Sequence, residues 1–341
     1  MHPKLSVLMP VHNGARFLPE AIESILGQTF ADFELLIVDD GSDDETPAIL
    51  RAYAAKDLRV RVVPAARRGL VATLNDGLSR ARSDLVARMD ADDVALPERL
   101  ERQYRHMAGD PGLWVLGTQW DLVDGNGRRR PAPKPMPTAA GDVAVAMLRY
   151  NAVHHPTVLM RRAPVVELGG YRPAYEHAED YDLWLRIVEA GGRIETLDWI
   201  GLSYRVSGAP KVWQGIAGQI SADLARATHA LRRAGADDPT KDLPAPPPIG
   251  KPSLLDSLIP GTISFYRLLQ EAASPRSAAH AHRLMRWACR MPVESRHRRC
   301  FQEMLLRLVR SRSRWDAPMV RGLLRALALH PGRFVRLMLG T

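Results

Sequence analysis

The chain has 341 residues, of which 46% are hydrophobic and 25% charged, a composition that excludes a disordered or fibrous protein. This length predicts about two domains. The only cysteines, Cys289 and Cys300, are too few for a disulfide framework and lack zinc-finger spacing, so we expect a reducing compartment. No secretory signal and no apolar run of roughly 18 residues is visible. The sequence therefore predicts a soluble, cytoplasmic protein.

The formal net charge of +9 is unevenly distributed along the chain. Residues 1–250 hold 30 Lys and Arg against 33 Asp and Glu, whereas residues 251–341 hold 17 against 5. Because the larger part of the chain carries a small excess of negative charge, it is poorly suited to bind nucleic acid. We expect no nucleic-acid partner.

A proline-rich stretch at residues 244–250 marks a boundary between two regions, because proline continues neither a helix nor a central strand. We interpret residues 1–240 as one domain, 241–253 as a linker, and 254–341 as a basic, mostly α-helical C-terminal region.

The first domain alternates strand and helix patterns in chain order. Apolar runs predict strands, and amphipathic stretches between them predict helices. This alternation is typical of an α/β fold with a parallel, doubly wound sheet that helices cover on both faces. Ligands of such sheets bind beyond the carboxyl ends of the strands. The expected strands are 5–9, 33–38, 59–63 and 85–89; the helices between them are 17–26, one that starts at 43–47, and 70–81.

Carboxylates gather where two of these strands end. Asp39 and Asp40 follow the second strand, and the segment 90–93 follows the fourth. Either group alone is also compatible with an ordinary turn or helix cap. Clustered carboxylates repel one another unless a cation or hydrogen-bond donors compensate. The alternation Asp90-Ala91-Asp92 suits a hard divalent cation such as Mg²⁺ or Mn²⁺.

Five motifs in this order resemble the family 2 glycosyltransferases, which have the Rossmann-like GT-A fold. The likeness covers roughly residues 4–207 and is specific for the family and the fold, but not for the sugar. The motifs occupy residues 6–14, 36–42, 88–93, 155–158 with 169–171, and 178–186.

The resemblance implies a nucleotide-sugar site at the first two strand ends. Pro10, Val11 and His12 match the loop that contacts the nucleotide through its backbone. Asp39 matches the carboxylate that binds the nucleoside, usually at a uracil ring, and Asp40 matches its neighbour.

The remaining donor-side positions follow in the same way. Arg68 lies where the family often places a residue that contacts the base or the phosphates. Asp90, Ala91 and Asp92 match the motif that holds the metal and the sugar nucleotide. Asp92 is the expected metal ligand, and Asp90 is expected either beside it or toward the ribose.

Asp180 matches the general base of inverting members of the family. Inversion needs one carboxylate to take the acceptor proton, while a metal stabilises the departing diphosphate. On a helix that begins near Glu176, Glu179 and Asp180 lie in the first turn. Acids in a first turn are also ordinary capping residues, so that interpretation stays open.

Three further positions carry two interpretations each. Trp184 is either a wall of the acceptor site or a core residue. His155, beside His154, either supports the acceptor side or is structural, because consecutive strand residues face opposite ways. Arg205 either reaches the diphosphate or is an exposed arginine on an antiparallel strand.

The C-terminal region combines leucines with regularly spaced arginines over residues 301–314 and 333–337. Such helices are compatible with peripheral contact with an anionic membrane. They are equally compatible with a helical cap or a homo-oligomer contact. The expected helices are 254–258, 264–273, 278–291, 294–312 and 317–339.

Together these features predict a metal-dependent, inverting glycosyltransferase with a UDP-sugar donor and a saccharide or glycolipid acceptor, active in bacterial surface polysaccharide synthesis. Because no Gln-x-x-Arg-Trp motif follows Asp180, the chain resembles a nonprocessive enzyme. Two alternatives stay open: a nucleotidyltransferase that makes nucleotide-sugars, and a non-catalytic scaffold that binds them.

Overall fold

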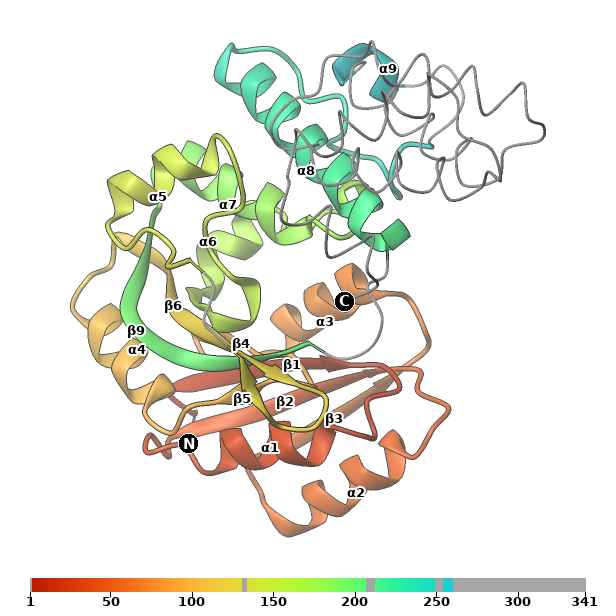
Figure 1. The fold of residues 1–341 in the computed structure, drawn as a ribbon, viewed down its shortest axis with the longest axis vertical. Coiled ribbons are helices and arrows are strands. Elements are labelled where there is room, and N and C mark those ends of the chain that lie inside the picture. The colour runs from red at the N-terminus through yellow and green to blue at the C-terminus, as the bar shows by residue number, and fades with distance from the viewer. Residues whose placement is uncertain (1, 131–133, 207–211, 249–253, 260–341) are drawn as a thin grey trace, which may run out of the picture. The chain divides into compact units, whose positions relative to one another are not determined.

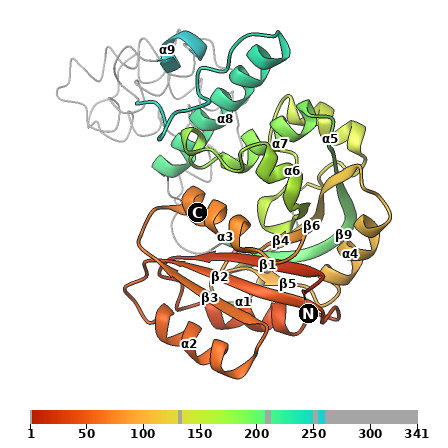
Figure 2. The ribbon, with the colours of Figure 1, turned by 180° about the vertical axis from the view of Figure 1, so that it is seen from behind.

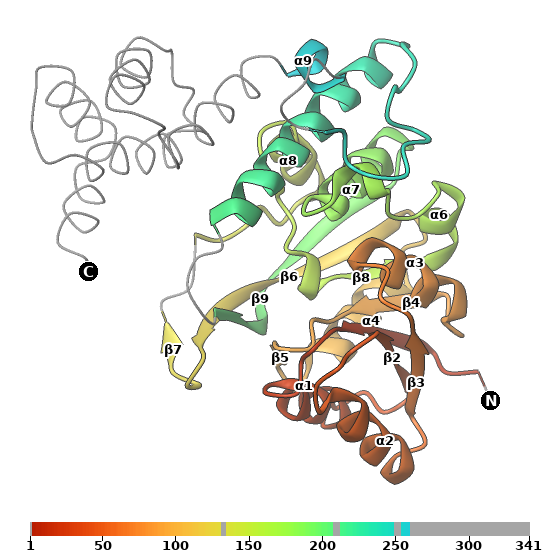
Figure 3. The same cartoon turned by 90° about the vertical axis from the view of Figure 1, so that its right-hand side faces the viewer.

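The computed structural model describes residues 2–130, 134–206, 212–248 and 254–259, and Figures 1, 2 and 3 show it from three sides. The chain divides into two compact units, Met1–Pro246 and Pro247–Thr341. Of the expected C-terminal helices only α9 (Leu254–Leu258) falls within the described residues. The other four lie outside them, so the linker, the membrane contact and the oligomer contact stay predictions.

The first unit begins with alternating strands and helices, as the apolar pattern predicts, and continues with longer strands. No described helix combines the length and apolar character needed to cross a membrane. The strands are β1 (Leu5–Val11), β2 (Phe33–Asp40), β3 (Val60–Ala65), β4 (Leu85–Arg88), β5 (Val94–Ala95), β6 (Leu113–Asp124), β7 (Arg129–Arg130), β8 (Leu159–Arg161) and β9 (Arg193–Val206). The α-helices are α1 (Leu18–Leu26), α2 (Thr46–Lys56), α3 (Leu70–Arg80), α4 (Arg99–Ala108), α5 (Ala140–Met147), α6 (Arg162–Glu167), α7 (Glu179–Glu189) and α8 (Val212–Arg233), with 3₁₀ turns at His155–Thr157 and Pro173–Tyr175.

The described strands form one mixed sheet in the order β3-β2-β1-β4-β8-β6-β9-β5, with β7 added beside β6. Strands β1 to β4 are parallel to one another, whereas β8 runs antiparallel to both β4 and β6. The parallel arrangement predicted from the first four strands is confirmed, and the antiparallel pairing begins beyond β4. Helical crossovers make the first four strands parallel, but this rule does not extend to β6 and β8, which pair across a loop-rich segment.

Helices cover both faces of the parallel half of the sheet. Figures 1 and 2 show α1 and α2 on one face and α3 on the other. Every residue of β1 and β2 is buried, which is why both strands read as continuous apolar runs. The core cluster joins alternate β1 residues such as Val7 and Met9 to Ile22 and Ile25 of α1.

A glycine lets α3 pack closely on β1. A Cβ atom added at Gly77 would lie 2.2 Å from Leu8 Cδ1 and 3.1 Å from Leu8 Cγ. Leu8 is fully buried on β1. The position of α3 matters for function because its first turn borders the strand ends.

Gly77→Ala is expected to destabilise the protein by about 1–3 kcal/mol, because the added methyl group overpacks against Leu8. Urea unfolding measures this change. The control is Gly141→Ala in α5, where an added Cβ meets open space. We expect no loss of stability in this variant. Equal effects of the two variants would contradict the packing argument.

Candidate active site

The carboxyl ends of β1, β2 and β4 meet at a small cavity of about 110 Å³, as expected for parallel strands of such a sheet. Five of the residues predicted from the sequence come together there, and the first turn of α3 completes the wall. The lining residues are Pro10, Val11, His12, Asp40, Leu70, Thr73 and Asp90.

Asp40 fixes the loop that precedes α3. Its two carboxylate oxygens accept hydrogen bonds from the backbone nitrogens of Arg68, at 2.7 Å, and Gly69, at 2.9 Å. Gly69 has a φ of 87°, which favours glycine. The Arg68 guanidinium points to Asp76 of α3, 3.2 Å away. Asp40 therefore shapes the cavity through the backbone, and in this structure the Arg68 side chain is held by α3.

Asp39 lies at the same strand end, and its carboxylate also accepts a backbone hydrogen bond. Its Oδ1 accepts a hydrogen bond from the Ser42 nitrogen at 3.0 Å, so it closes the turn after β2. The other side of the turn is tied to the β1 loop, because the Asn13 nitrogen donates to Ser42 Oγ at 2.9 Å. His12 Nδ1 lies 3.1 Å from the Asp40 carbonyl oxygen. Hydrogen bonds thus join the loop after β1 to the loop after β2.

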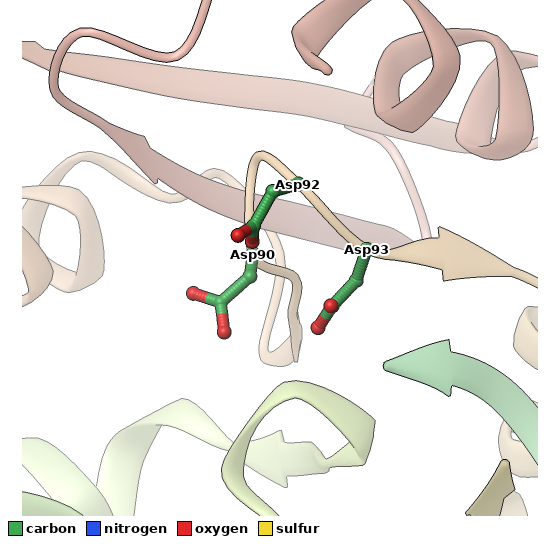
Figure 4. Close-up of side chains that lie close together, drawn as sticks. All are labelled: Asp90, Asp92 and Asp93. Carbon is green, nitrogen blue, oxygen red and sulfur yellow. The ribbon is translucent and has the colours of Figure 1, made fainter. Parts of the chain in front are cut away.

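An acidic cluster follows β4. Carboxylate oxygens of Asp90, Asp92 and Asp93 all lie within 4.8 Å of one another, and Figure 4 shows the three side chains on one short loop. Ala91 packs against the core, which turns its neighbours outward. Asp93 had no separate role in the sequence argument, although it belongs to the same segment.

Buried arginines hold this loop in place. Arg88 Nη1 lies 2.6 Å from Asp90 Oδ2. The Arg205 backbone nitrogen donates to Asp93 Oδ1 at 2.8 Å, and its Nε donates to the Asp92 carbonyl oxygen at 2.6 Å. Arg205 is 4% exposed, so the expectation of an exposed arginine is wrong. Arg205 is buried because the long strand β9 places its side chain against the loop that carries Asp92 and Asp93.

The arginines do not fully neutralise the cluster. Burial, followed by the neighbouring charge of Asp90, raises the pKa of Asp92 to about 6. The same causes raise the pKa of Asp93 well above its usual range. Asp93 Oδ2 is buried and has no hydrogen-bond partner among the described residues. Closely spaced carboxylates with an unpartnered oxygen fit a hard divalent cation.

Asp180 and Glu179 form a second acidic pair at the start of α7. Asp180 Oδ2 accepts a hydrogen bond from Asn151 Nδ2 at 2.7 Å, and Oδ1 accepts from the Tyr181 nitrogen at 2.8 Å. Burial raises the pKa of Asp180, and the charge of Arg88 opposes that shift. Since Arg88 also pairs with Asp90, one buried cation influences both acidic groups.

Helix α7 begins at Glu179 rather than near Glu176. A separate 3₁₀ turn, Pro173–Tyr175, precedes the helix. His177 follows this turn with a φ of 69°, which an α-helix does not allow. Both acids therefore do lie in the first turn of α7. The N-cap residue, Ala178, makes no side-chain capping bond, but Asp180 accepts from the first-turn nitrogen of Tyr181, so the capping interpretation stays open beside that of a base.

Trp184 and His155 lie behind the site rather than on its surface. Trp184 has no exposed surface and meets the His155 ring edge-on, with 5.9 Å between centroids. His155 Nε2 lies 2.8 Å from the Tyr171 hydroxyl. Burial lowers the pKa of His155 well below its usual range. In this structure both side chains support the site from within the core.

Sequence reasoning missed Arg88 and Asn151 as parts of the site. A signal for Arg88 was present, because a charged residue inside the buried strand β4 must have a buried partner. Asn151 gave no signal, since its contact with Asp180 joins residues 29 positions apart.

The family model of glycosyl transferase family 2 matches residues 6–169. The O-antigen biosynthesis glycosyltransferase WbnJ of Escherichia coli is 34% identical over 59% of this chain and 79% of its own length. The amylovoran biosynthesis glycosyltransferase AmsE of Erwinia amylovora is 31% identical over 67% of this chain and 87% of its own. The chain belongs to glycosyl transferase family 2, and it is a glycosyltransferase.

Solved structures agree with the fold. Residues 1–349 of S. aureus TarS in complex with UDP-GlcNAc match with a TM-score of 0.55 and 17% identity, over 99% of this chain and 92% of that one. The mannosyltransferase PcManGT from Pyrobaculum calidifontis, in complex with GDP-Man and Mn²⁺, matches with a TM-score of 0.54 and 20% identity, over 96% and 88%. The central mixed sheet is thus that of a GT-A glycosyltransferase.

Glu179 is expected to make stability depend on pH. It is 5% exposed, and burial together with Asp180 raises its pKa to about 7. Because the pKa is raised in the folded state, this stabilisation is complete at low pH and is lost as the pH rises through about 7. We expect a loss of about 1 kcal/mol between pH 6 and pH 8.

Urea unfolding at pH 6 and pH 8 measures this loss in the unmodified protein and in Glu179→Gln. The variant keeps the size of the side chain but does not titrate, so its stability should change less over this interval. An identical pH dependence in both proteins would show that Glu179 titrates normally.

Proposed function

We propose that this glycosyltransferase is metal-dependent and inverting, and that it moves a sugar from a UDP-sugar to a hydroxyl group of a saccharide or glycolipid. The observation that carries the proposal is the acidic cluster beside the strand-end cavity. A nucleoside diphosphate brings negative charge to the same edge of the sheet, and a cation between the two relieves both repulsions.

Asp92 and Asp90 are the proposed ligands of Mn²⁺ or Mg²⁺, with Asp93 beside them. Such a cation, when bound, stabilises the charge on the departing diphosphate. Pro10, Val11 and His12 offer backbone and ring groups to the nucleotide along the cavity wall. The turn at Asp39 and Asp40 and the loop at Arg68 shape the cavity. This position supports a role for these three residues in binding the base and the ribose.

Asp180 is the proposed general base. During inversion the acceptor oxygen attacks the anomeric carbon as the bond from that carbon to the diphosphate oxygen breaks, and the acceptor proton passes to the carboxylate. The raised pKa of Asp180 favours taking up this proton. Asn151 orients the carboxylate, while Glu179, Trp184 and His155 support it from the protein side.

The products of the two relatives suggest where the enzyme acts. WbnJ is named for O-antigen biosynthesis and AmsE for amylovoran biosynthesis. We propose that this chain likewise adds one sugar during assembly of a bacterial surface polysaccharide. The nucleotidyltransferase alternative requires pyrophosphate release, and the scaffold alternative requires binding without turnover, so assays of released product separate them.

Asp180→Asn is expected to lower sugar transfer by about 10²–10⁴-fold, because the amide cannot accept the proton. Binding of UDP should be unchanged, since Asn retains a similar shape. Release of UDP from the sugar nucleotide measures turnover. The control is Asp142→Asn, an exposed acid in the first turn of α5, which should retain full turnover. Full turnover by folded Asp180→Asn would rule out this base.

Asp92→Ala is expected to weaken Mn²⁺-dependent UDP binding by more than about tenfold, because a metal ligand is lost. Calorimetric titration with and without Mn²⁺ measures the effect. Asp84→Ala is the control, since Asp84 is exposed and lies before β4, at the end of the strand away from the cluster. If Asp92→Ala binds UDP with the same Mn²⁺ dependence, the metal assignment fails.

A further inference from the structure

A second cavity, of about 270 Å³, lies beside strands β6 and β9, which run next to each other in Figure 3. Two tryptophans line it together with a basic, an acidic and an amide side chain, a combination that the metal and base assignments leave unused. The lining residues are Gln119, Trp120, Lys134, Pro135, Asp198, Trp199 and Ile200.

A bulge in β9 creates this cavity. Thr118 pairs with Leu197, but the next residue, Gln119, pairs with Ile200. Asp198 and Trp199 are therefore extra residues, and they line the cavity instead of continuing the ladder. Bulges re-aim side chains in this way next to functional sites.

Both sides of the cavity are structurally fixed. An added Cβ at Gly201 would lie 2.6 to 2.9 Å from three Thr118 side-chain atoms, so only glycine lets β9 return to β6 after the bulge. Gln119 donates to the Met136 carbonyl oxygen and accepts from the Met136 nitrogen, each at 2.9 Å. These bonds hold the segment that carries Lys134 and Pro135.

Each indole is backed on one face. The Arg102 guanidinium lies 4.6 Å from the ring centroid of Trp199. The His154 ring stacks on Trp120 with 4.2 Å between centroids and 22° between planes. Arg102 and His154 therefore each cover one face of an indole. The other face or the edge of each ring lines the cavity. Among the described residues, the Asp198 and Lys134 side chains have no hydrogen-bond or ion-pair partner.

Aromatic contacts connect the cavity to the acidic cluster. Trp120 meets Tyr204 edge-on at 5.7 Å, and the next residue, Arg205, donates its backbone nitrogen to Asp93. From Ile200 to Arg205 the strand spans at most about 17 Å. A ligand in the cavity therefore lies beside the reaction site but not at the metal ligands themselves.

We propose that this cavity binds a sugar ring of the acceptor saccharide, at a unit removed from the hydroxyl group that reacts. Indole rings suit the apolar C–H faces of a pyranose, while the carboxylate of Asp198 and the ammonium of Lys134 suit its hydroxyls. The inference rests on the proposed function, and it adds that the acceptor is longer than one sugar.

The protein's seven tryptophans allow a direct test by ¹⁹F NMR of the full chain labelled with 5-fluorotryptophan. Trp199→Phe and Trp120→Phe assign the two signals of interest. The probes are trisaccharides of glucose, galactose, mannose, rhamnose and N-acetylglucosamine, together with the five monosaccharides. We expect at least one trisaccharide to shift the Trp199 and Trp120 signals, and to bind more tightly than its monosaccharide.

Trp199→Ala should weaken that trisaccharide by about fivefold, measured on the Trp120 signal. The control is Trp114→Phe, a half-buried tryptophan on β6, the strand that carries Trp120, but outside the cavity; this variant should leave the affinity unchanged. If no trisaccharide moves the Trp199 signal, or if Mn²⁺ and UDP move it instead, the proposal is overturned.

Titration with Mn²⁺ and UDP separates this inference from the proposed function. Trisaccharide shifts without any nucleotide binding would contradict the donor site and leave the cavity as a saccharide site. Nucleotide binding without any trisaccharide shift of the Trp199 signal would support the donor site and contradict the saccharide site.

Discussion

Repulsion among Asp90, Asp92 and Asp93 is the constraint around which this structure is organised. Three carboxylates within 4.8 Å of one another persist only where nearby positive charge and donors offset their repulsion. Arg88 supplies an ion pair, and the Arg205 backbone supplies a donor. A third buried arginine, Arg99, donates to the Arg88 carbonyl oxygen at 2.7 Å, so it holds the strand end that presents the loop. The remaining uncompensated charge makes this edge of the sheet attractive to a divalent cation.

The rest of the first unit positions groups around that charge. The parallel strands bring the β1 and β2 loops to the same edge, and the Asp39 and Asp40 carboxylates accept backbone hydrogen bonds that fix the turn after β2 and the loop before α3. The mixed part of the sheet places β9, with Arg205, beside the acidic loop, and α7 carries Asp180. Arg88 influences the pKa of Asp180 as well as pairing with Asp90. A single buried side chain therefore acts electrostatically on both acidic groups, the cluster after β4 and the pair at the start of α7.

The parallel half of the fold and its strand-end residues were predictable, because both depend on local apolar patterns and on one general rule about parallel sheets. Pro10, His12, Asp40 and Asp90 meet as that rule requires. The antiparallel entry of β8, the buried position of Arg205 and the β9 bulge at Trp199 were not predictable. Each depends on pairing between segments distant in sequence, and a period-2 pattern contains no partner information. The start of α7 depended on one left-handed residue, His177.

The central claim is that the acidic cluster binds a nucleoside diphosphate through a divalent cation. Calorimetric titration of the full chain with UDP, GDP and dTDP, each with and without Mn²⁺, tests it most directly. We predict binding of UDP that depends on Mn²⁺, and weaker binding of the other two nucleotides. Binding of none of them by folded protein would contradict the claim.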